Sequence, residues 1–153
     1  MITKENVLAA QDSWGSAIVE IGSHKGKETL TDVTSNIIDR LYAYELGTVL
    51  FKPTKAAEIQ FRPTKESALS YFIGGNSNFP EDGGFAIQPW TAVRFENSDI
   101  ILEENRAIAM GNYFFTDLDG GVTKVEYTFG YKKDGNGNLK IDLHHSSLPY
   151  NPA

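Results

Sequence analysis

The sequence predicts an α+β domain whose N-terminal helices pack in the concave face of a curved antiparallel sheet. Two observations support this prediction. The first half of the chain carries apolar residues at helical spacing, and the part from Phe85 onward carries long strand-like runs divided by turn residues. Helices followed by a run of strands are typical of the α+β class. Since 153 residues suffice for one substantial core but not comfortably for two, we expect residues 1–153 to form a single domain.

The first two helices are predicted from apolar periodicity. Residues 4–22 repeat apolar side chains at helical spacing, with Thr3 as a suitable N-cap and Gly22 as a stop. A second helix is expected from about residue 31 to near residue 47. The polar turn at residues 23–27 separates the two helices.

A short strand and a third helix are expected before the sheet. The run Val49–Phe51 predicts a strand that ends before Pro53, because proline cannot donate to a sheet ladder. Residues 63–72 predict a helix that stops at Gly74. Four long strands should follow as an antiparallel meander, since Asp-Gly and Asn-Gly sequences supply hairpin turns. The expected strands are 90–102, 106–116, 122–132 and 139–147.

Helices on one side leave the other face of such a sheet uncovered. Val125, Tyr127, Phe129 and Tyr131 alternate along one strand and therefore share a face. We expect this bulky face to be the exposed one and to form a homodimer, because large apolar patches commonly mark interfaces.

Composition excludes several classes of function. The net charge of −6 and the absence of a long basic run argue against nucleic acid and anionic membranes as partners. The chain has no cysteine, which excludes disulfides and thiol chemistry. Residues 1–6 contain no apolar signal segment, so we expect a cytoplasmic protein.

The end of the last expected strand carries the most chemically distinctive run, residues 143–150. Because side chains alternate along a strand, His144 and Ser146 share one face while His145 and Ser147 share the other. Imidazole and hydroxyl groups at the end of an apolar strand indicate a polar pocket, and we expect one of these two faces to line it.

The layout of helices and terminal sheet resembles the cone-shaped fold of nuclear transport factor two, polyketide cyclases and the association domain of calcium/calmodulin-dependent kinase. Several runs are more specific and resemble the iota class of carbonic anhydrases, over about residues 50–149. They are Leu50–Thr54, Phe61–Thr64, Ala68–Phe72, Ala109–Phe115 and His144–Pro149. The His-His-Ser-Ser sequence is the most specific of these, since the fold alone serves many functions.

The resemblance implies reversible hydration of CO2 to bicarbonate. Carried over to this chain, it implies that the groups around bicarbonate and the attacking water are Thr54, Tyr71, His144 and Ser146. Asn112 and Tyr113 are further candidates for lining the substrate site. Ser146 and Tyr71 would orient a water toward CO2, and His144 would act as general base or proton shuttle.

Two threonines follow a proline, and only one is assigned to the site. We prefer Thr54, because Thr64 has an evident duty as N-cap of the third helix. Arg62 could supply positive potential for bicarbonate, but we favour a structural duty for it.

A zinc site is not expected. Zinc-hydroxide enzymes need three protein ligands, and the three histidines of this chain do not form such a set. His144 and His145 point to opposite faces, and His24 lies in a polar turn. We therefore prefer a reaction without a metal cofactor, which agrees with the resemblance. A manganese-dependent alternative stays open.

Two other functions fit the same fold. An isomerase or cyclase would need a buried carboxylate base, for which Glu126 and Asp142 are the mid-strand candidates. A non-catalytic oligomerisation or ligand-binding module would instead form rings, as expected of a kinase association domain.

Overall fold

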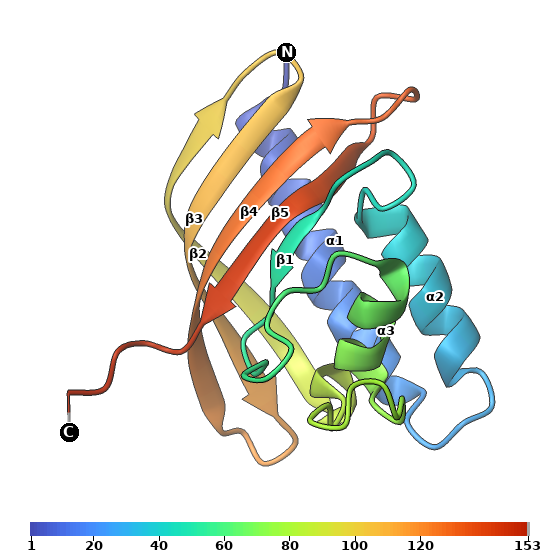
Figure 1. The fold of residues 1–153 in the computed structure, drawn as a ribbon. Coiled ribbons are helices and arrows are strands. Elements are labelled where there is room, and N and C mark those ends of the chain that lie inside the picture. The colour runs from blue at the N-terminus through green and yellow to red at the C-terminus, as the bar shows by residue number, and fades with distance from the viewer. Residues whose placement is uncertain (153) are drawn as a thin grey trace.

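The computed structural model describes residues 1–152 and contains one five-stranded mixed sheet (Figure 1). The order of strands is β1-β5-β4-β3-β2. The predicted meander is confirmed, and it consists of β2 (Trp90–Leu102), β3 (Arg106–Asp117), β4 (Val122–Lys133) and β5 (Leu139–Ser147). The turns after β3 and β4 place Gly120 and Gly137 at φ of 86° and 82°, a backbone conformation that favours glycine.

The short strand β1 (Leu50–Lys52) adds a parallel strand to the free edge of β5. The sequence predicts this strand, shifted by one residue, but its pairing was not anticipated. The register places Phe51 opposite His144 and Lys52 opposite His145. This pairing determines which residues of the following loop reach the end of β5.

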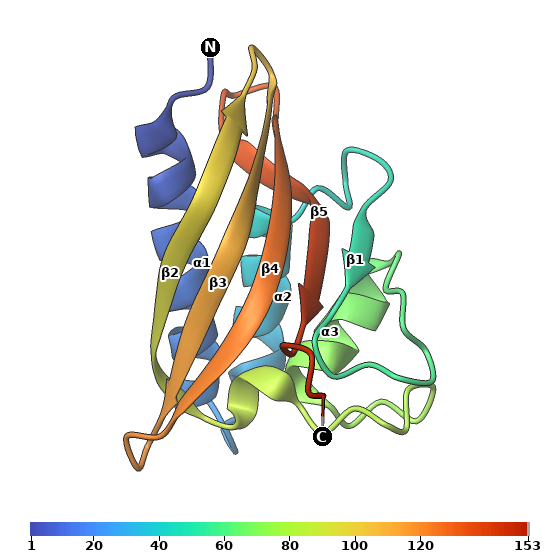
Figure 2. The ribbon, with the colours of Figure 1, turned by 90° about the vertical axis from the view of Figure 1, so that its left-hand side faces the viewer.

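The helices lie on one side of the sheet, whose long strands curve around them (Figures 1 and 2). They are α1 (Lys4–Ser23), α2 (Leu30–Leu41) and α3 (Lys65–Ile73), and a short 3₁₀ turn, η1 (Phe85–Ile87), precedes β2. The helix α2 ends at Leu41, earlier than predicted. Tyr42 is extended and bridges to Ile141, and the Ala43 amide donates to the Ile141 carbonyl at 2.8 Å, so the chain leaves the helix to join the sheet edge.

The face proposed for a homodimer is instead the interior of the fold. Val125, Tyr127, Phe129 and Tyr131 are at most 2% exposed and belong to the core beneath the helices. Their strand does have one bulky face, but that face is the concave one. The argument for a dimer was therefore wrong, and the oligomeric state stays a prediction.

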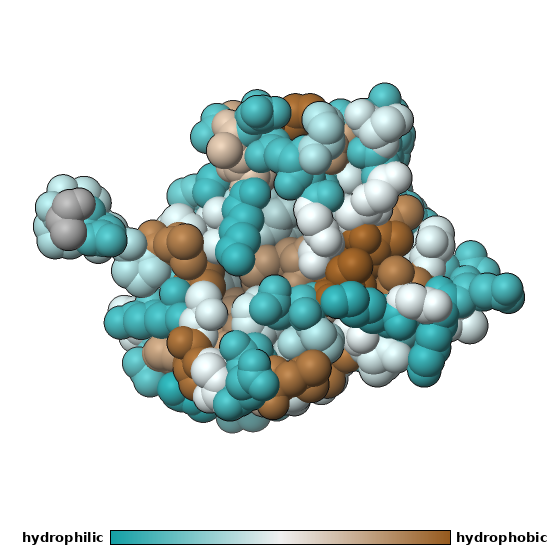
Figure 3. Space-filling model, turned by 90° about the horizontal axis from the view of Figure 1, so that it is seen from below, coloured by the Kyte–Doolittle hydropathy of each residue, from teal (hydrophilic) through white to brown (hydrophobic). Residues whose placement is uncertain are grey.

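The surface carries hydrophilic residues interspersed with apolar ones, as seen from below (Figure 3). Leu50 and Phe61 are among the exposed apolar side chains, at 62% and 67%. Over residues 1–152, no helix has the length and apolarity needed to cross a membrane.

Candidate active site

The pairing of β1 with β5 forms the site. Because Phe51 lies opposite His144 in a parallel register, the loop after β1 runs beside the end of β5. Thr54 in this loop lies with its Oγ1 atom 2.6 Å from Oγ of Ser146. Residues that are 92 positions apart in sequence thus form one hydrogen-bonded pair.

The predicted division of the terminal run between two faces is confirmed. His144 and Ser146 point into the fold and are 2% and 1% exposed. His145 is exposed on the outer face, and the Ser147 hydroxyl donates there to Glu126. The inner face of β5 therefore holds one imidazole and one hydroxyl, those of His144 and Ser146.

The imidazole of His144 is enclosed by aromatic rings and hydroxyls. Phe51 stacks on it with centroids 4.6 Å apart, and Phe129 lies at 4.2 Å. Its Nδ1 atom is 2.8 Å from the Tyr42 hydroxyl, and its Nε2 atom is 3.1 Å from the Tyr113 hydroxyl. Burial lowers the pKa of His144 well below its usual value, so the ring is neutral at pH 7.

These contacts do not support His144 as a general base or proton shuttle. Both ring nitrogens already have partners, and the ring has almost no contact with solvent. A base whose pKa has been lowered by burial also accepts a proton poorly near neutral pH. The geometry instead fits a group that holds Tyr113 in place.

Hydroxyl groups continue from Tyr113 toward the loop after β1. The Tyr113 hydroxyl is 2.5 Å from Oγ of Ser146, which in turn contacts Thr54. Tyr71 of α3 accepts a hydrogen bond from the Lys55 amide at 3.1 Å, and the Thr54 side chain lies close enough to influence the pKa of Tyr71. Burial raises the pKa of both Tyr71 and Tyr113, so these phenols are neutral donors and acceptors at physiological pH.

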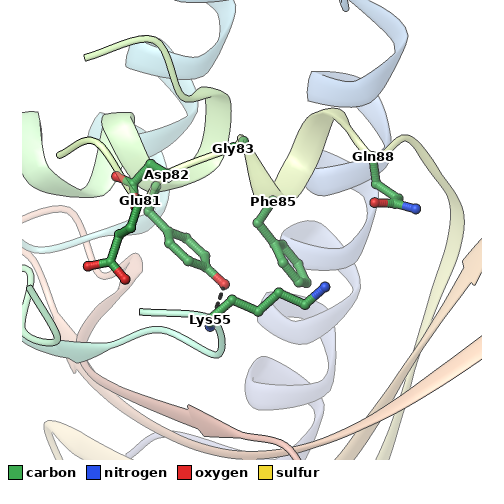
Figure 4. A pocket seen from close by; sticks show the side chains of 8 residues that line it. Lys55, Glu81, Asp82, Gly83, Phe85 and Gln88 are labelled. Carbon is green, nitrogen blue, oxygen red and sulfur yellow. Dashed lines mark hydrogen bonds between the residues drawn. The ribbon is translucent and has the colours of Figure 1, made fainter. Parts of the chain in front are cut away.

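A pocket of about 210 Å³ opens beside Tyr71 (Figure 4). Its lining includes Lys55, Glu81, Phe85 and Gln88. The Lys55 side chain passes beneath Phe85 and points away from Glu81. Glu81 accepts hydrogen bonds from the amides of Ala57, Glu58 and Ile59, which lower its pKa and keep it a fixed anion. This pocket gives small molecules a route to the Tyr71 end of the hydroxyl cluster.

Asn112 does not take part. It precedes Tyr113 on β3, so its side chain points to the outer face of the sheet and lines a surface hollow with His145 and Glu126. Its assignment as a lining residue was wrong, since a mid-strand polar residue can face either side. The two threonines separate as expected: Thr64 caps α3 by accepting from the Ser67 amide.

Arg62 has a structural role, as the sequence analysis expected. Its guanidinium is fully buried and forms two hydrogen bonds of 2.7 Å with Asp82. It also donates to the Ile59 and Ser67 carbonyls, so none of it is offered to a substrate.

The carboxylates considered for an isomerase lie elsewhere. Glu126 is on the outer face, and Asp142 pairs with Arg106. Among residues 1–152, no group of three or more histidines or carboxylates is arranged to hold a metal ion.

Two buried residues of this site were missed in the sequence. Tyr42 contacts His144, and its hydroxyl accepts from Nε1 of Trp14 at 3.0 Å. Trp14 stands out only as one apolar position of a helix, and Tyr42 lies where the helix was expected to continue. No spacing in the sequence connects α1, the end of α2 and β5, so tertiary packing alone brings them together.

Comparison with known proteins gives a consistent assignment. The family described as metal-independent carbonic anhydrase matches residues 5–148. A metal-independent carbonic anhydrase from Nostoc sp. strain PCC 7120 is 45% identical over 153 residues, covering 97% of this chain and 75% of that protein. The crystal structure of a cyanobacterial iota-carbonic anhydrase complexed with bicarbonate superimposes with a TM-score of 0.94 at 44% identity, covering 98% of this chain and 94% of that one.

More distant structures share the fold. A Xanthomonas campestris protein described as a calcium/calmodulin-dependent protein kinase II association domain is 26% identical, with a TM-score of 0.62 over 99% of this chain and 91% of that one. A protein from Streptomyces avermitilis, described as a dehydratase of the NTF2-like family, has a TM-score of 0.56 at 15% identity, covering 96% of each chain. These distant structures confirm the cone-shaped fold. The family match and the relatives above 40% identity go further, because they identify one family within that fold. The chain belongs to the metal-independent carbonic anhydrases.

Proposed function

We propose that this carbonic anhydrase hydrates CO2 at the hydroxyl cluster formed by Thr54, Tyr71, Tyr113 and Ser146. The observation that carries the proposal is the continuous contact from Tyr113 through Ser146 to Thr54, which ends beside the pocket at Tyr71. The similar cyanobacterial enzyme was crystallised with bicarbonate, which supports an anion of this size in the same fold.

The reaction needs an oriented water rather than a preformed hydroxide. Lowering the pKa of water from 15.7 to about 7, as zinc does, corresponds to roughly 12 kcal/mol. Neutral hydroxyls cannot supply this, because each hydrogen bond contributes about 0.5–1.5 kcal/mol net. We therefore propose that a water held at Ser146 attacks CO2 while it is still neutral, and that it loses its proton to solvent through the pocket.

Catalysis then depends on stabilising charge as it develops. When the water oxygen bonds to carbon, the π electron pair of one C=O bond of CO2 moves onto its oxygen, which becomes a negatively charged carboxylate oxygen. Hydroxyl protons at Thr54 and Tyr71 can donate to this oxygen, and fixed donors contribute most to such a transition state. Lys55 adds a positive charge at the pocket that offsets the fixed negative charge of Glu81.

Stopped-flow CO2 hydration by chelator-treated protein tests the site. Ser146→Ala and Tyr71→Phe should lower kcat by about 10²-fold, as the loss of one fixed hydroxyl does in comparable sites. Ser147→Ala and Tyr150→Phe are matched controls, because both side chains lie outside the cluster. Full activity of both site variants would refute the assignment, and activity only with added metal would refute the mechanism.

The homodimer stays a proposal, although the argument from an exposed bulky face no longer supports it, and the cytoplasmic location stays a proposal based on the N-terminal sequence. Light scattering tests the first of them. It would also detect large rings. Such rings are expected if the chain acts as an association domain, which is the alternative function that the 26% identical relative supports.

A further inference from the structure

One line of hydrogen bonds crosses the core and ends in the proposed site. It passes from α1 through the end of α2 to β5, then to β3, and back through β5 to the loop after β1. Its successive atoms are Trp14 Nε1, Tyr42 OH, His144 Nδ1 and Nε2, Tyr113 OH, Ser146 Oγ and Thr54 Oγ1. The separations range from 2.5 to 3.1 Å. A hydroxyl or a neutral imidazole can donate in either direction, so the direction of such a line must be fixed by something outside it.

Trp14 and Tyr42 provide that constraint. An indole N–H can only donate, so Tyr42 accepts from Trp14. Tyr42 is 2% exposed, and among residues 1–152 the other hydrogen-bond neighbour of its hydroxyl is Nδ1 of His144. If Tyr42 also accepted from Nδ1, its own proton would be buried without an acceptor, which is costly. Tyr42 therefore donates to Nδ1.

The remaining directions follow one after another. His144 is neutral, so with Nδ1 accepting, its proton is on Nε2 and is donated to Tyr113. The Tyr113 proton then goes to Ser146, and the Ser146 proton goes to Thr54. Ser146 has no proton left to give and keeps one free lone pair.

The far end of the line has at least one proton to spare. Thr54 accepts from Ser146, and Tyr71 accepts from the Lys55 amide. Neither of these bonds uses the proton of the accepting hydroxyl, so at least one of the two protons is free even if one hydroxyl donates to the other. The site thus offers one acceptor at Ser146 and at least one donor at the Thr54–Tyr71 end.

We propose that Trp14 and Tyr42 are positioning residues that fix this direction, and that the resulting pattern selects bicarbonate by its hydroxyl group. Bicarbonate has one O–H to donate to Ser146 and anionic oxygens to accept from Thr54 or Tyr71. Nitrate has the same charge and a similar planar shape but no proton, so it would leave the Ser146 lone pair unpaired. The selection of bicarbonate rests on the proposed function, whereas the direction of the line does not.

The tautomer of His144 tests the direction without any ligand. The chain has three histidines, so in a His24→Gln/His145→Gln protein the ¹⁵N spectrum of the imidazole reports His144 alone. At pH 7 we expect the proton on Nε2 and a hydrogen-bonded, unprotonated Nδ1. A proton on Nδ1, or a charged ring, would overturn the proposal.

Substitution of Tyr42 tests its part in this arrangement. Tyr42→Phe should shift the Nδ1 resonance toward that of a free imine nitrogen. Tyr44→Phe is the matched control, since the Tyr44 ring stacks on Tyr42 at 6.0 Å but its hydroxyl donates to the Arg62 carbonyl. Equal spectra for Tyr42→Phe and wild type would contradict the inference.

Anion titrations test selection. Wild-type protein should bind bicarbonate roughly tenfold more tightly than nitrate, the ratio expected for one unpaired buried group. In Ser146→Ala the two affinities should converge. Equal binding of both anions by wild type would overturn the proposed selection. A failure to bind bicarbonate at all would refute the proposed function, while the tautomer would still decide the direction of the line.

Discussion

Phe51 lies nearly parallel to the imidazole of His144, with ring centroids 4.6 Å apart and planes at 11°. The two residues are also register partners in the parallel pairing of β1 and β5. The backbone pairing with β5 and the stacking on His144 therefore both hold β1 in position. The loop that follows β1 carries Thr54, so this stack is what holds a hydroxyl of that loop against Ser146.

Removal of the Phe51 ring should strongly destabilise the fold. Phe51 is 3% exposed, and loss of a buried aromatic ring leaves a cavity that costs about 3–5 kcal/mol. Urea unfolding of Phe51→Ala should show this decrease in the free energy of unfolding. Phe61→Ala is the control, because Phe61 is 67% exposed and should change stability by no more than about 0.5 kcal/mol. Equal stabilities of the two variants would contradict the packing described.

Adjacent histidines should differ sharply in their effect on activity. His144→Gln removes the ring that holds Tyr113, so we expect kcat for CO2 hydration to fall at least about tenfold. His145→Gln changes an exposed side chain on the outer face and should leave kcat within about twofold. Stopped-flow assays on both variants, with circular dichroism as a check of folding, decide the question. A larger loss for His145→Gln would reverse the assignment of the faces.

Burial of a neutral His144 should make stability depend on pH. Its pKa is lowered in the folded protein, whereas the unfolded chain titrates near 6.5. As the pH falls below about 6.5, the unfolded state takes up a proton that the folded state does not. The free energy of unfolding should therefore decrease, by up to about 1.4 kcal/mol per pH unit, until the lowered pKa is reached.

Urea unfolding at pH 7.5, 6.5 and 5.5 measures this dependence. The contribution of His144 should be absent from His144→Gln, so the stability of the variant should fall less steeply with decreasing pH. Parallel curves for wild type and variant would show that His144 is not a buried neutral base.

Local patterns predicted the helices and strands, but not their long-range pairing. The runs that became β2 to β5 could be recognised because Asp-Gly and Asn-Gly turns divide them. The early end of α2 could not be recognised, since it depends on Tyr42 pairing with Ile141 across 99 residues. The inward face of Val125 and Tyr127 was misassigned for a related reason: alternation shows that two residues share a face, but not which face the helices cover.

Strand alternation correctly grouped His144 with Ser146 on the inner face, and Thr64 is the N-cap that the sequence predicted. The assignment of Thr54 to the active site stays a prediction. Asn112 was misplaced because Asn112 and Tyr113 are neighbours on one strand and point to opposite faces, so only one of them could line the site. The contact of Trp14 with Tyr42 has no local signal at all, because it depends on how α1 packs over the sheet.

The buried pair of Arg62 and Asp82 should be essential for stability rather than for chemistry. Both side chains are at most 1% exposed, and Asp82 also accepts from the Ser70 hydroxyl at 2.6 Å, which ties the loop before η1 to α3. Asp82→Asn leaves the guanidinium buried without its counter-charge, a change that typically costs about 3–5 kcal/mol. Urea unfolding should show this loss. Lys65→Met removes the Lys65–Asp39 pair, whose side chains are 36% and 35% exposed, and should cost less than about 1 kcal/mol. If Asp82→Asn were as stable as Lys65→Met, Arg62 would not need its partner, and its availability to an anion in the neighbouring pocket would have to be reconsidered.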